Sequence, residues 1–339
     1  LPGAAFRRGR YCVHLKDNET LGGATTHTEI SGVCDYKAIN DQDALDKIRS
    51  IFDKISESSL AGFNRTEKKD PAKDPKNIYR LLPASRAEQY DMHEIISCII
   101  DHDSLEEYKA DYGRTLICTY ARIEGWAVGI VANQRKIVKN GKKEMQFGGV
   151  IYSDSADKAT RFIANCNQKK IPLVFLQDVT GFMVGSKSEH GGIIKDGAKM
   201  VNAVSNSVVP KFTVVVGNSY GAGNYAMCGK AYDPRLIVSW PSAELAVMGG
   251  AQAAKVLLQI ETFSMKSKGE TITEEKEKEI LDHITEKYNR QTSPYYAAAR
   301  LWTDGIIDPL DTRKWISMGI EAANHKPISR EFNLGIIQV

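Results

Sequence analysis

Residues 211–227 read KFTVVVGNSYGAGNYAM. The apolar, largely β-branched run Phe212–Val216 lies between Pro210 and Gly217, which predicts a buried strand. Small residues follow as far as Gly223, and the sequence then continues as a short helix. A strand that passes through such a loop into a helix presents backbone N–H groups that have no helical partner. The stretch therefore predicts a site for an anion or a developing oxyanion.

The same order of strand, glycine or proline loop and helix occurs twice more nearby. Ile171–Gln177 predicts a strand before a loop that contains Gly181 and Gly185. Arg235–Trp240 predicts another strand, before Pro241. The three units together predict an α/β layer whose chemistry lies at the strand ends. One such loop alone is better explained as a tight connection, whereas two glycine-rich loops in succession favour a site.

The composition is that of an ordinary soluble globular protein, with 42% hydrophobic and 26% charged residues in a chain of 339. The net charge of +3 is too small to predict a nucleic-acid partner. Because no apolar run approaches the roughly 18 residues that cross a membrane, we expect no integral membrane segment. The six cysteines and seven histidines show no metal-ligand spacing, so we also expect no metal.

The chain is predicted to divide into two parts. Residues 1–78 form an irregular and linker segment with one helix, over 41–56, because the polar run 64–78 is typical of a solvated linker. Residues 79–339 form the main domain. Within this domain, Asp91 is the predicted N-cap of a helix over 92–100, and Asn140-Gly141 predicts a hairpin. The charged helix over 273–288, with Thr273 as its predicted N-cap, is expected to be exposed or to face a partner.

The common phosphate-binding motifs are absent, because the loop glycines have neither P-loop nor dinucleotide-binding spacing. GNSYG at 217–221 has G-x-S-x-G spacing around Ser219, whereas Ser242 has no such context, and a nucleophilic triad is otherwise poorly supported. His190 is the one histidine near a candidate loop, and a non-catalytic role is favoured for it. What remains is a set of backbone amides that would stabilise an enolate or ureido oxyanion without a side-chain acid or base.

Several motifs between Gly125 and Val339 match a known family in combination. They are TGFMVG at 180–185, GIIKDGAKMV at 192–201, GNSYGAGNYAMCGKAYDPR at 217–235, AVMGGAQAA at 246–254 and PYYAAARLWTDGIIDPLDTR at 294–313. With these motifs the chain resembles the carboxyltransferase (β) subunits of biotin-dependent acyl-CoA carboxylases. The GAGNYAMCGKAY stretch is most similar to the methylcrotonoyl-CoA carboxylase branch.

The resemblance implies an α/β fold of the crotonase-like (ClpP/crotonase) type, with repeated ββα units and flanking helices. Such subunits contain an N-terminal domain for the acyl-CoA and a C-terminal domain for biotin. This chain resembles the C-terminal domain over 79–339, so catalysis would need the N-terminal domain as well. The family's active sites lie where two protomers meet, which implies a homo-oligomer. The implied partner is a biotin carboxylase or biotin-carrier subunit, in the bacterial cytosol or the mitochondrial matrix.

The resemblance also implies which residues form the site. The catalytic groups would be backbone amides that hold the ureido oxygen of biotin, in Gly181, Phe182, Ala222 and Gly223. The cofactor-binding residues would form the wall of the pocket: Tyr220, Gly221, Phe182 and Tyr225. Of these, Tyr225 lies where the choice of acyl group could be tuned. Core packing remains an alternative role for the three aromatic side chains.

The implied reaction is carboxyl transfer from carboxybiotin to an acyl-CoA, best matched by 3-methylcrotonyl-CoA. Carboxybiotin releases CO₂, the ureido anion takes a proton from the acyl-CoA, and the resulting enolate attacks CO₂. Three alternatives stay open. They are transfer to acetyl- or propionyl-CoA, the carboxyltransferase of a biotin-dependent decarboxylase, and a non-catalytic scaffold fragment that docks a biotin carrier.

Overall fold

A computed structural model of the protein describes residues 17–55, 59–85, 88–267, 273–335 and 337. Packing divides the chain into two compact units, Leu1–Ser58 and Ser59–Val339. This boundary differs from the division predicted at residue 78. Ile78, at the end of the polar run, is 1% exposed and belongs to the core of the larger unit. The run predicted as a solvated linker therefore lies within the larger unit, because its end is held by apolar burial.

Helices occur in both units. The described helices of the smaller unit are α1 (Asn18–Gly22), a π-helical turn (Thr26–Ile30) and α2 (Asp41–Phe52). Those of the larger unit are α3 (Ile78–Leu81), α4 (Met92–Ile99), α5 (Ser153–Gln168), α6 (Ser186–His190), α7 (Ile193–Ser205), α8 (Gly221–Ala226), α9 (Gly250–Ser267), α10 (Glu274–Thr292), α11 (Pro294–Ala298) and α12 (Thr312–Asn324). Short 3₁₀ turns cover Pro75–Asn77, Lys230–Tyr232 and Pro309–Asp311.

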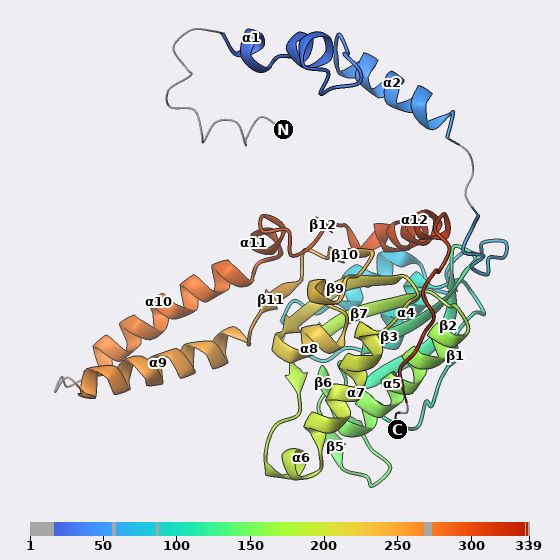
Figure 1. Cartoon of the computed structure of the whole chain (residues 1–339). Helices are drawn as coiled ribbons and strands as arrows, with labels where there is room; N and C mark the ends of the chain where they lie inside the picture. The colour runs from blue at the N-terminus through green and yellow to red at the C-terminus, as the bar shows by residue number, and fades with distance from the viewer. Residues whose placement is uncertain (1–16, 56–58, 86–87, 268–272, 336, 338–339) are drawn as a thin grey trace. The chain divides into compact units, whose positions relative to one another are not determined.

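The larger unit is built on a mostly parallel sheet (Figure 1). Its strands are β1 (Glu106–Glu107), β2 (Leu116–Ile123), β3 (Trp126–Asn133), β7 (Leu173–Val179), β9 (Lys211–Tyr220), β10 (Leu236–Ser239), β11 (Glu244–Ala246) and β12 (Gly305–Ile306). The order is β1-β2-β3-β7-β9-β10-β12, and β11 pairs with the end of β9. Only the pairs β1–β2 and β2–β3 are antiparallel. Phe175 of β7 lies opposite Val131 of β3 and Thr213 of β9.

Two smaller sheets accompany the main one. β6 (Val150–Ile151) pairs in parallel with β8 (Gly181–Phe182), and β4 (Val138–Lys139) pairs with β5 (Met145–Gln146) in a hairpin. The hairpin encloses Asn140-Gly141, as the sequence predicted. Apart from the β4–β5 hairpin and α6, which are inserted, two strands and a helix follow each other as β3-β6-α5, β7-β8-α7 and β10-β11-α9. The predicted ββα repeat is therefore present.

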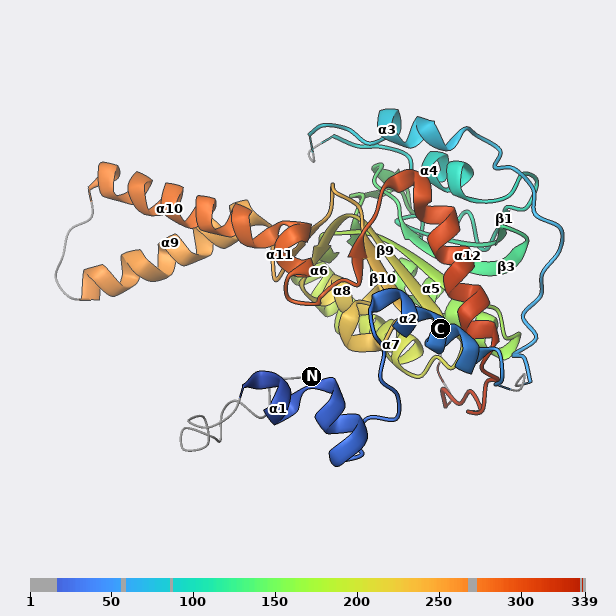
Figure 2. The ribbon, with the colours of Figure 1, turned by 90° about the horizontal axis from the view of Figure 1, so that it is seen from above.

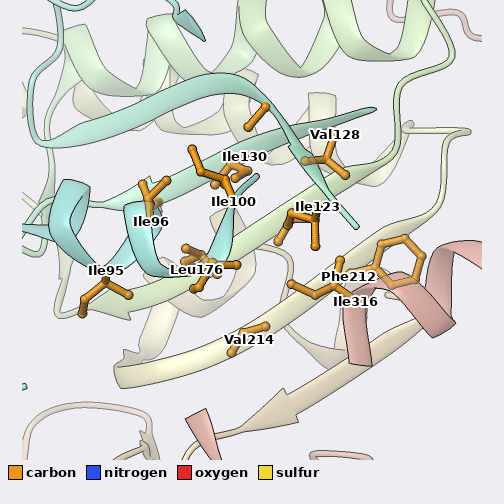
Figure 3. Close-up of a cluster of buried hydrophobic side chains, with 14 of the residues drawn as sticks. Ile95, Ile96, Ile100, Ile123, Val128, Ile130, Leu176, Phe212, Val214 and Ile316 are labelled. Carbon is orange, nitrogen blue, oxygen red and sulfur yellow. The ribbon is translucent and has the colours of Figure 1, made fainter. Parts of the chain in front are cut away.

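Neighbouring residues of each strand point to opposite sides of the sheet, and packed helices bury both faces. Leu176 and Val214 pack with Ile95 and Ile96 of α4 and Ile316 of α12 (Figure 3). On the other face, a second cluster joins Leu173 and Phe175 of β7 to α5 and α7. This double burial explains why the central strands read as continuous apolar runs.

β9 is longer than the sequence predicted, since it runs on to Tyr220 and does not end at Val216. The carboxylate of Asp178 accepts the backbone N–H of Asn218 at 2.8 Å, and β11 pairs with the added residues. A methyl group on Gly217 would lie 2.5 Å from the Asp178 carboxyl carbon. Gly217 therefore makes room for the Asp178 carboxylate beside the strand.

The predicted helix starts at Asp91 and Thr273 are confirmed. The Asp91 side chain accepts the N–H of His93, and that of Thr273 accepts the N–H of Lys276. α9 and α10 lie side by side and extend away from the sheet (Figure 2). No described helix has the length and apolar character that a membrane span requires.

A chain of charged groups joins α4 to the edge of the sheet. His93 Nε2 lies 2.9 Å from the Glu107 carboxylate, and Nδ1 lies 3.0 Å from that of Asp91. The fully buried Lys158 adds a charge 3.7 Å from Glu107. The hydrogen bond with Glu107 raises the pKa of His93 above its usual 6.5, burial opposes this, and the hydrogen bond with Asp91 adds to the rise.

The raised pKa predicts a pH-dependent contribution of His93 to stability. A raised folded pKa stabilises the protein fully below the unfolded pKa, and the gain is lost as pH rises through the folded pKa. Substitution of His93→Gln should therefore lower the melting temperature more near pH 6 than near pH 9. Thermal unfolding of both proteins across this range tests it, and a difference that stays constant or grows with pH would contradict the assignment.

Candidate functional site

The two predicted glycine loops lie at the ends of neighbouring parallel strands. β7 ends at Val179, and Gly181 follows in β8. β9 ends at Tyr220, and α8 begins at Gly221. Because the carboxyl ends of parallel strands meet at one edge of a sheet, the fold brings the loops to the same place.

The loops touch through their glycines. A methyl group on Gly223 would lie 2.6 Å from Val179 Cγ2 and 3.2 Å from the Cα of Gly181, closer than the 3.5–4.0 Å, roughly, of a good carbon–carbon contact. Gly181 has φ +143°, a conformation that other residues rarely adopt. The structure thus brings together two residues, Gly181 and Gly223, that the sequence placed in one site.

A cavity of about 700 Å³ opens beside α8. Gly221, Ala222 and Tyr225 contribute to one wall, and Tyr288 and Thr292 of α10 contribute to another. The size lies within the roughly 300–1,000 Å³ usual for small-molecule pockets. A second cavity, of about 530 Å³, lies between β9 and α12 and includes no residue of either glycine loop. The cavity beside α8 is taken as the candidate site because Gly221 and Ala222 of the second glycine loop line it, although Gly181, Phe182 and Gly223 do not.

Gly221 fixes the start of α8 against the next loop. Its φ is +50°, and a methyl group on it would lie 2.7 Å from the backbone oxygen of Val247. Both observations exclude a side chain without local rearrangement. Gly221 is thus held close to a second piece of backbone at the rim of the cavity.

Phe182 and Tyr220 pack inward and are not among the side chains that line the cavity. Phe182 lies against α7, where a methyl group on Gly197 would approach its ring to 2.8 Å. Tyr220 is 7% exposed and donates its hydroxyl to Glu244 and, at 3.2 Å, to Asn218. These contacts favour the packing role for both side chains. These side-chain contacts do not test the roles predicted for the backbone amides, which stay predictions.

Tyr225 is the predicted aromatic residue that does line the cavity. Its side chain is 49% exposed, and its ring centroid lies 5.8 Å from that of Tyr232. A half-exposed ring supported on one side is available to contact a bound molecule. The side chain can therefore contribute to ligand choice without a role in the core.

The cavity lacks the usual acids and bases, and the hydroxyl of Ser219, which lines it, is donated to Gln177. Among the described residues that line it, none is an aspartate, glutamate, histidine or cysteine, and the one cation, Lys230, is paired with Asp304 at 2.5 Å. His190, in α6, does not line it. Within the described residues, no cluster of three or more His, Cys, Asp or Glu side chains could hold a metal. The chemistry on offer is that of backbone amides and neutral side chains.

The nearest thiol is also unsuited to nucleophilic chemistry. Cys228, two residues after α8, is fully buried, and burial raises its pKa to about 11. Burial likewise raises the pKa of Cys118 to about 12, and it raises that of the buried Cys166. These buried thiols are protonated at neutral pH and are therefore poor nucleophiles.

The far wall of the cavity was not identified from the sequence. It includes Tyr288, Thr292, Tyr296 and Trp302, from α10, α11 and the following turn. α10 was predicted to be an exposed or partner-facing arm, and most of its side chains are exposed. The available signal was local: Tyr288 and Thr292 lie one helical turn apart near the end of an otherwise charged helix.

Comparison with known proteins gives this geometry its context. Residues 13–334 match the family model of the carboxyl transferase domain. The chain is 43% identical over 316 residues to the mitochondrial methylcrotonoyl-CoA carboxylase beta chain of Arabidopsis thaliana, covering 91% of this chain and 51% of that relative. It is 42% identical over 312 residues to the biotin-dependent 3-methylcrotonyl-coenzyme A carboxylase beta1 subunit of Mycobacterium tuberculosis, covering 92% and 56%.

Among solved structures, the beta subunit of Pseudomonas aeruginosa geranyl-CoA carboxylase matches with a TM-score of 0.76 at 35% identity, over 96% of this chain and 59% of that one. The fold is therefore that of carboxyltransferase β subunits, and the predicted crotonase-like class is confirmed. The chain belongs to the carboxyl transferase domain family. It spans about half the length of the curated relatives that it matches.

The close approach at Gly221 predicts that a methyl group is not tolerated there. Gly221→Ala should lower the free energy of unfolding by about 1–3 kcal/mol, because a left-handed φ and a backbone clash are imposed together. Gly141→Ala is the matched control, since a methyl group there meets no atom within 4 Å. Urea unfolding measures both variants, and equal stabilities would show that Val247 moves away without cost.

Proposed function

We propose that this chain supplies the biotin-binding half of a carboxyltransferase site, in a protein that transfers a carboxyl group from carboxybiotin to an acyl-CoA. The proposal rests on the meeting of two glycine loops beside a cavity whose described lining offers no acid or base. Such a site suits a reaction in which charge develops on oxygen and is met by backbone amides. Residues 79–339 would form the carboxyltransferase C-terminal domain.

The backbone N–H groups of Ala222 and Gly223, with those of Gly181 and Phe182, would hold the ureido oxygen of biotin. The lining suits the uncharged rings of biotin, because its polar groups are neutral apart from the paired Lys230. Carboxybiotin would supply the carboxyl group and, through its ureido nitrogen, the base. The protein's part is then to orient the two reactants, exclude water and stabilise the oxyanion.

The acyl substrate is proposed to be 3-methylcrotonyl-CoA. The support is the name shared by the two relatives at 42% and 43% identity. Tyr225, half exposed at the cavity, would contact the acyl group. The proposed partner is a biotin carboxylase subunit with its biotin carrier, because the cavity would receive biotin from another chain.

Three alternative functions remain as possible outcomes of the test described below. Acetyl- or propionyl-CoA would require a cavity of the same kind with different acyl contacts. A biotin-dependent decarboxylase would use the same amides, since forward and reverse transfer pass through one transition state. A scaffold fragment would dock the carrier and transfer nothing.

Reverse carboxyl transfer to free biotin tests the proposal directly. The donors are 3-methylglutaconyl-CoA, malonyl-CoA and methylmalonyl-CoA, offered to this chain and to the longest natural form of the protein. We expect transfer by the long form, fastest from 3-methylglutaconyl-CoA, and none by this chain alone, because the acyl-CoA half of the site would be missing.

Other results of this assay would support a different function. Preference for malonyl- or methylmalonyl-CoA would assign the protein to the acetyl or propionyl branch. Absence of transfer from all three donors by the long form would refute the enzyme and leave the scaffold. Calorimetry of biotin binding to the long form provides a measurement that does not depend on turnover.

We also propose that the protein is a homo-oligomer. α9 exposes four apolar side chains, by between 42% and 77%: Val256, Leu257, Ile260 and Phe263. Clustered exposed apolar residues mark interaction surfaces, and the second protomer would cover them.

The oligomer should dissociate when this surface is made charged. Ile260→Glu combined with Phe263→Glu is expected to give a smaller species in sedimentation velocity, because two carboxylates would be buried without partners. Glu279→Lys, on the exposed side of α10, is the control and should leave the sedimentation coefficient unchanged. A monomeric wild type at micromolar concentration would contradict the proposal.

A further inference from the structure

A hydrogen-bonded chain of three side chains links β7 to α8. Asn224 donates its side-chain N–H to the hydroxyl of Ser219 at 2.6 Å. The Ser219 hydroxyl donates to Oε1 of Gln177, also at 2.6 Å. Gln177 is fully buried and Ser219 is 1% exposed, so water does not compete for the bond between them, whereas Asn224 is partly buried and lines the cavity together with Ser219.

Gln177 also holds the far end of the same helix. Its Nε2 donates to the backbone oxygen of Met227 at 2.7 Å, at the C-terminal cap of α8. One side chain from β7 therefore bonds to Ser219, two residues before α8, and to Met227, the residue after it. Both functional groups of its amide are used, and neither faces the cavity.

The helix does not hold its place by its own stability. α8 has six residues, two of which are glycines, and an isolated helix of that length is unstable in water. Its position therefore depends on tertiary contacts. Gly221 and Gly223 supply close packing, while the Gln177 amide supplies the directional bonds.

We propose that Gln177 is a positioning residue for carboxyl transfer, acting through Ser219 and Asn224 to hold α8 and its amides at the edge of the cavity. This rests on the function proposed above. Gln177 does not touch the substrate. Its effect is on the placement of the groups that do, and a misplacement of about 1 Å in such groups can cost on the order of 100-fold in rate.

Three variants of the longest natural form separate positioning from stability. Gln177→Met keeps a similar length and removes both hydrogen bonds, and Ser219→Ala removes the next bond along the chain. Thr213→Val is the control. It deletes the 2.7 Å hydrogen bond from the buried Thr213 hydroxyl to the backbone oxygen of Cys228, which lies beside α8 but outside the chain from Gln177.

Gln177→Met should lower kcat in reverse transfer about 10- to 100-fold while KM changes by less than about two-fold. Ser219→Ala should lower kcat as well, and the double variant should fall no further than the more damaged single variant, because both break one chain. Thr213→Val should melt at a lower temperature with kcat unchanged, and its effects should add to those of Gln177→Met.

Additive losses of kcat in Gln177→Met and Ser219→Ala, or an equal loss in Thr213→Val, would overturn the assignment. A wild type that transfers nothing would refute the proposed function instead. Hydrogen exchange of the amides in 219–228 then decides about Gln177 by itself. Faster exchange in Gln177→Met but not in Thr213→Val supports positioning, and unchanged exchange contradicts it.

Discussion

The contact between Gly223 and the turn at Val179–Gly181 is the constraint on which the rest of the site depends. With a methyl group on Gly223 only 3.2 Å from the Cα of Gly181, α8 can approach β8 this closely only through a glycine. The approach also requires β7 and β9 to be direct parallel neighbours. Their register shifts between Gln177 and Val179, so that Val179 lies opposite Ser219. Sheet order, irregular register and glycine thus act together to bring two distant loops to one point.

Two consecutive side chains at the end of β7 hold this arrangement from opposite faces of the sheet. Gln177 bonds to Ser219, two residues before α8, and to Met227, the residue after it. Asp178 accepts the Asn218 N–H and, at 2.7 Å, the hydroxyl of Tyr90, and lies 3.2 Å from Nε of Arg135. Since successive residues of a strand point to opposite sides, one short segment fixes the strand end on both faces.

Local patterns were enough to predict the strands, the two glycine loops and the helix caps at Asp91 and Thr273, because each depends on neighbours in the sequence. The extension of β9 was missed because it depends on β11 and on Asp178, which lie elsewhere in the chain. The far wall with Tyr288 was missed for the same reason, since only folding brings α10 to α8. The inward packing of Phe182 follows from the space at Gly197, which no linear pattern encodes.

The two walls of the cavity come from different parts of the chain. α8 forms one wall, and α10, α11 and the turn at Trp302 form the other. Mutation can therefore remodel the far wall while the glycine loops and Gln177 stay as they are. Selection on such a scaffold can exchange one ligand for another in small steps, each leaving the wall at α8 unchanged. Divergence of preference among descendants of a common ancestor then needs no change in the strand ends, and an engineer would begin with the far wall too.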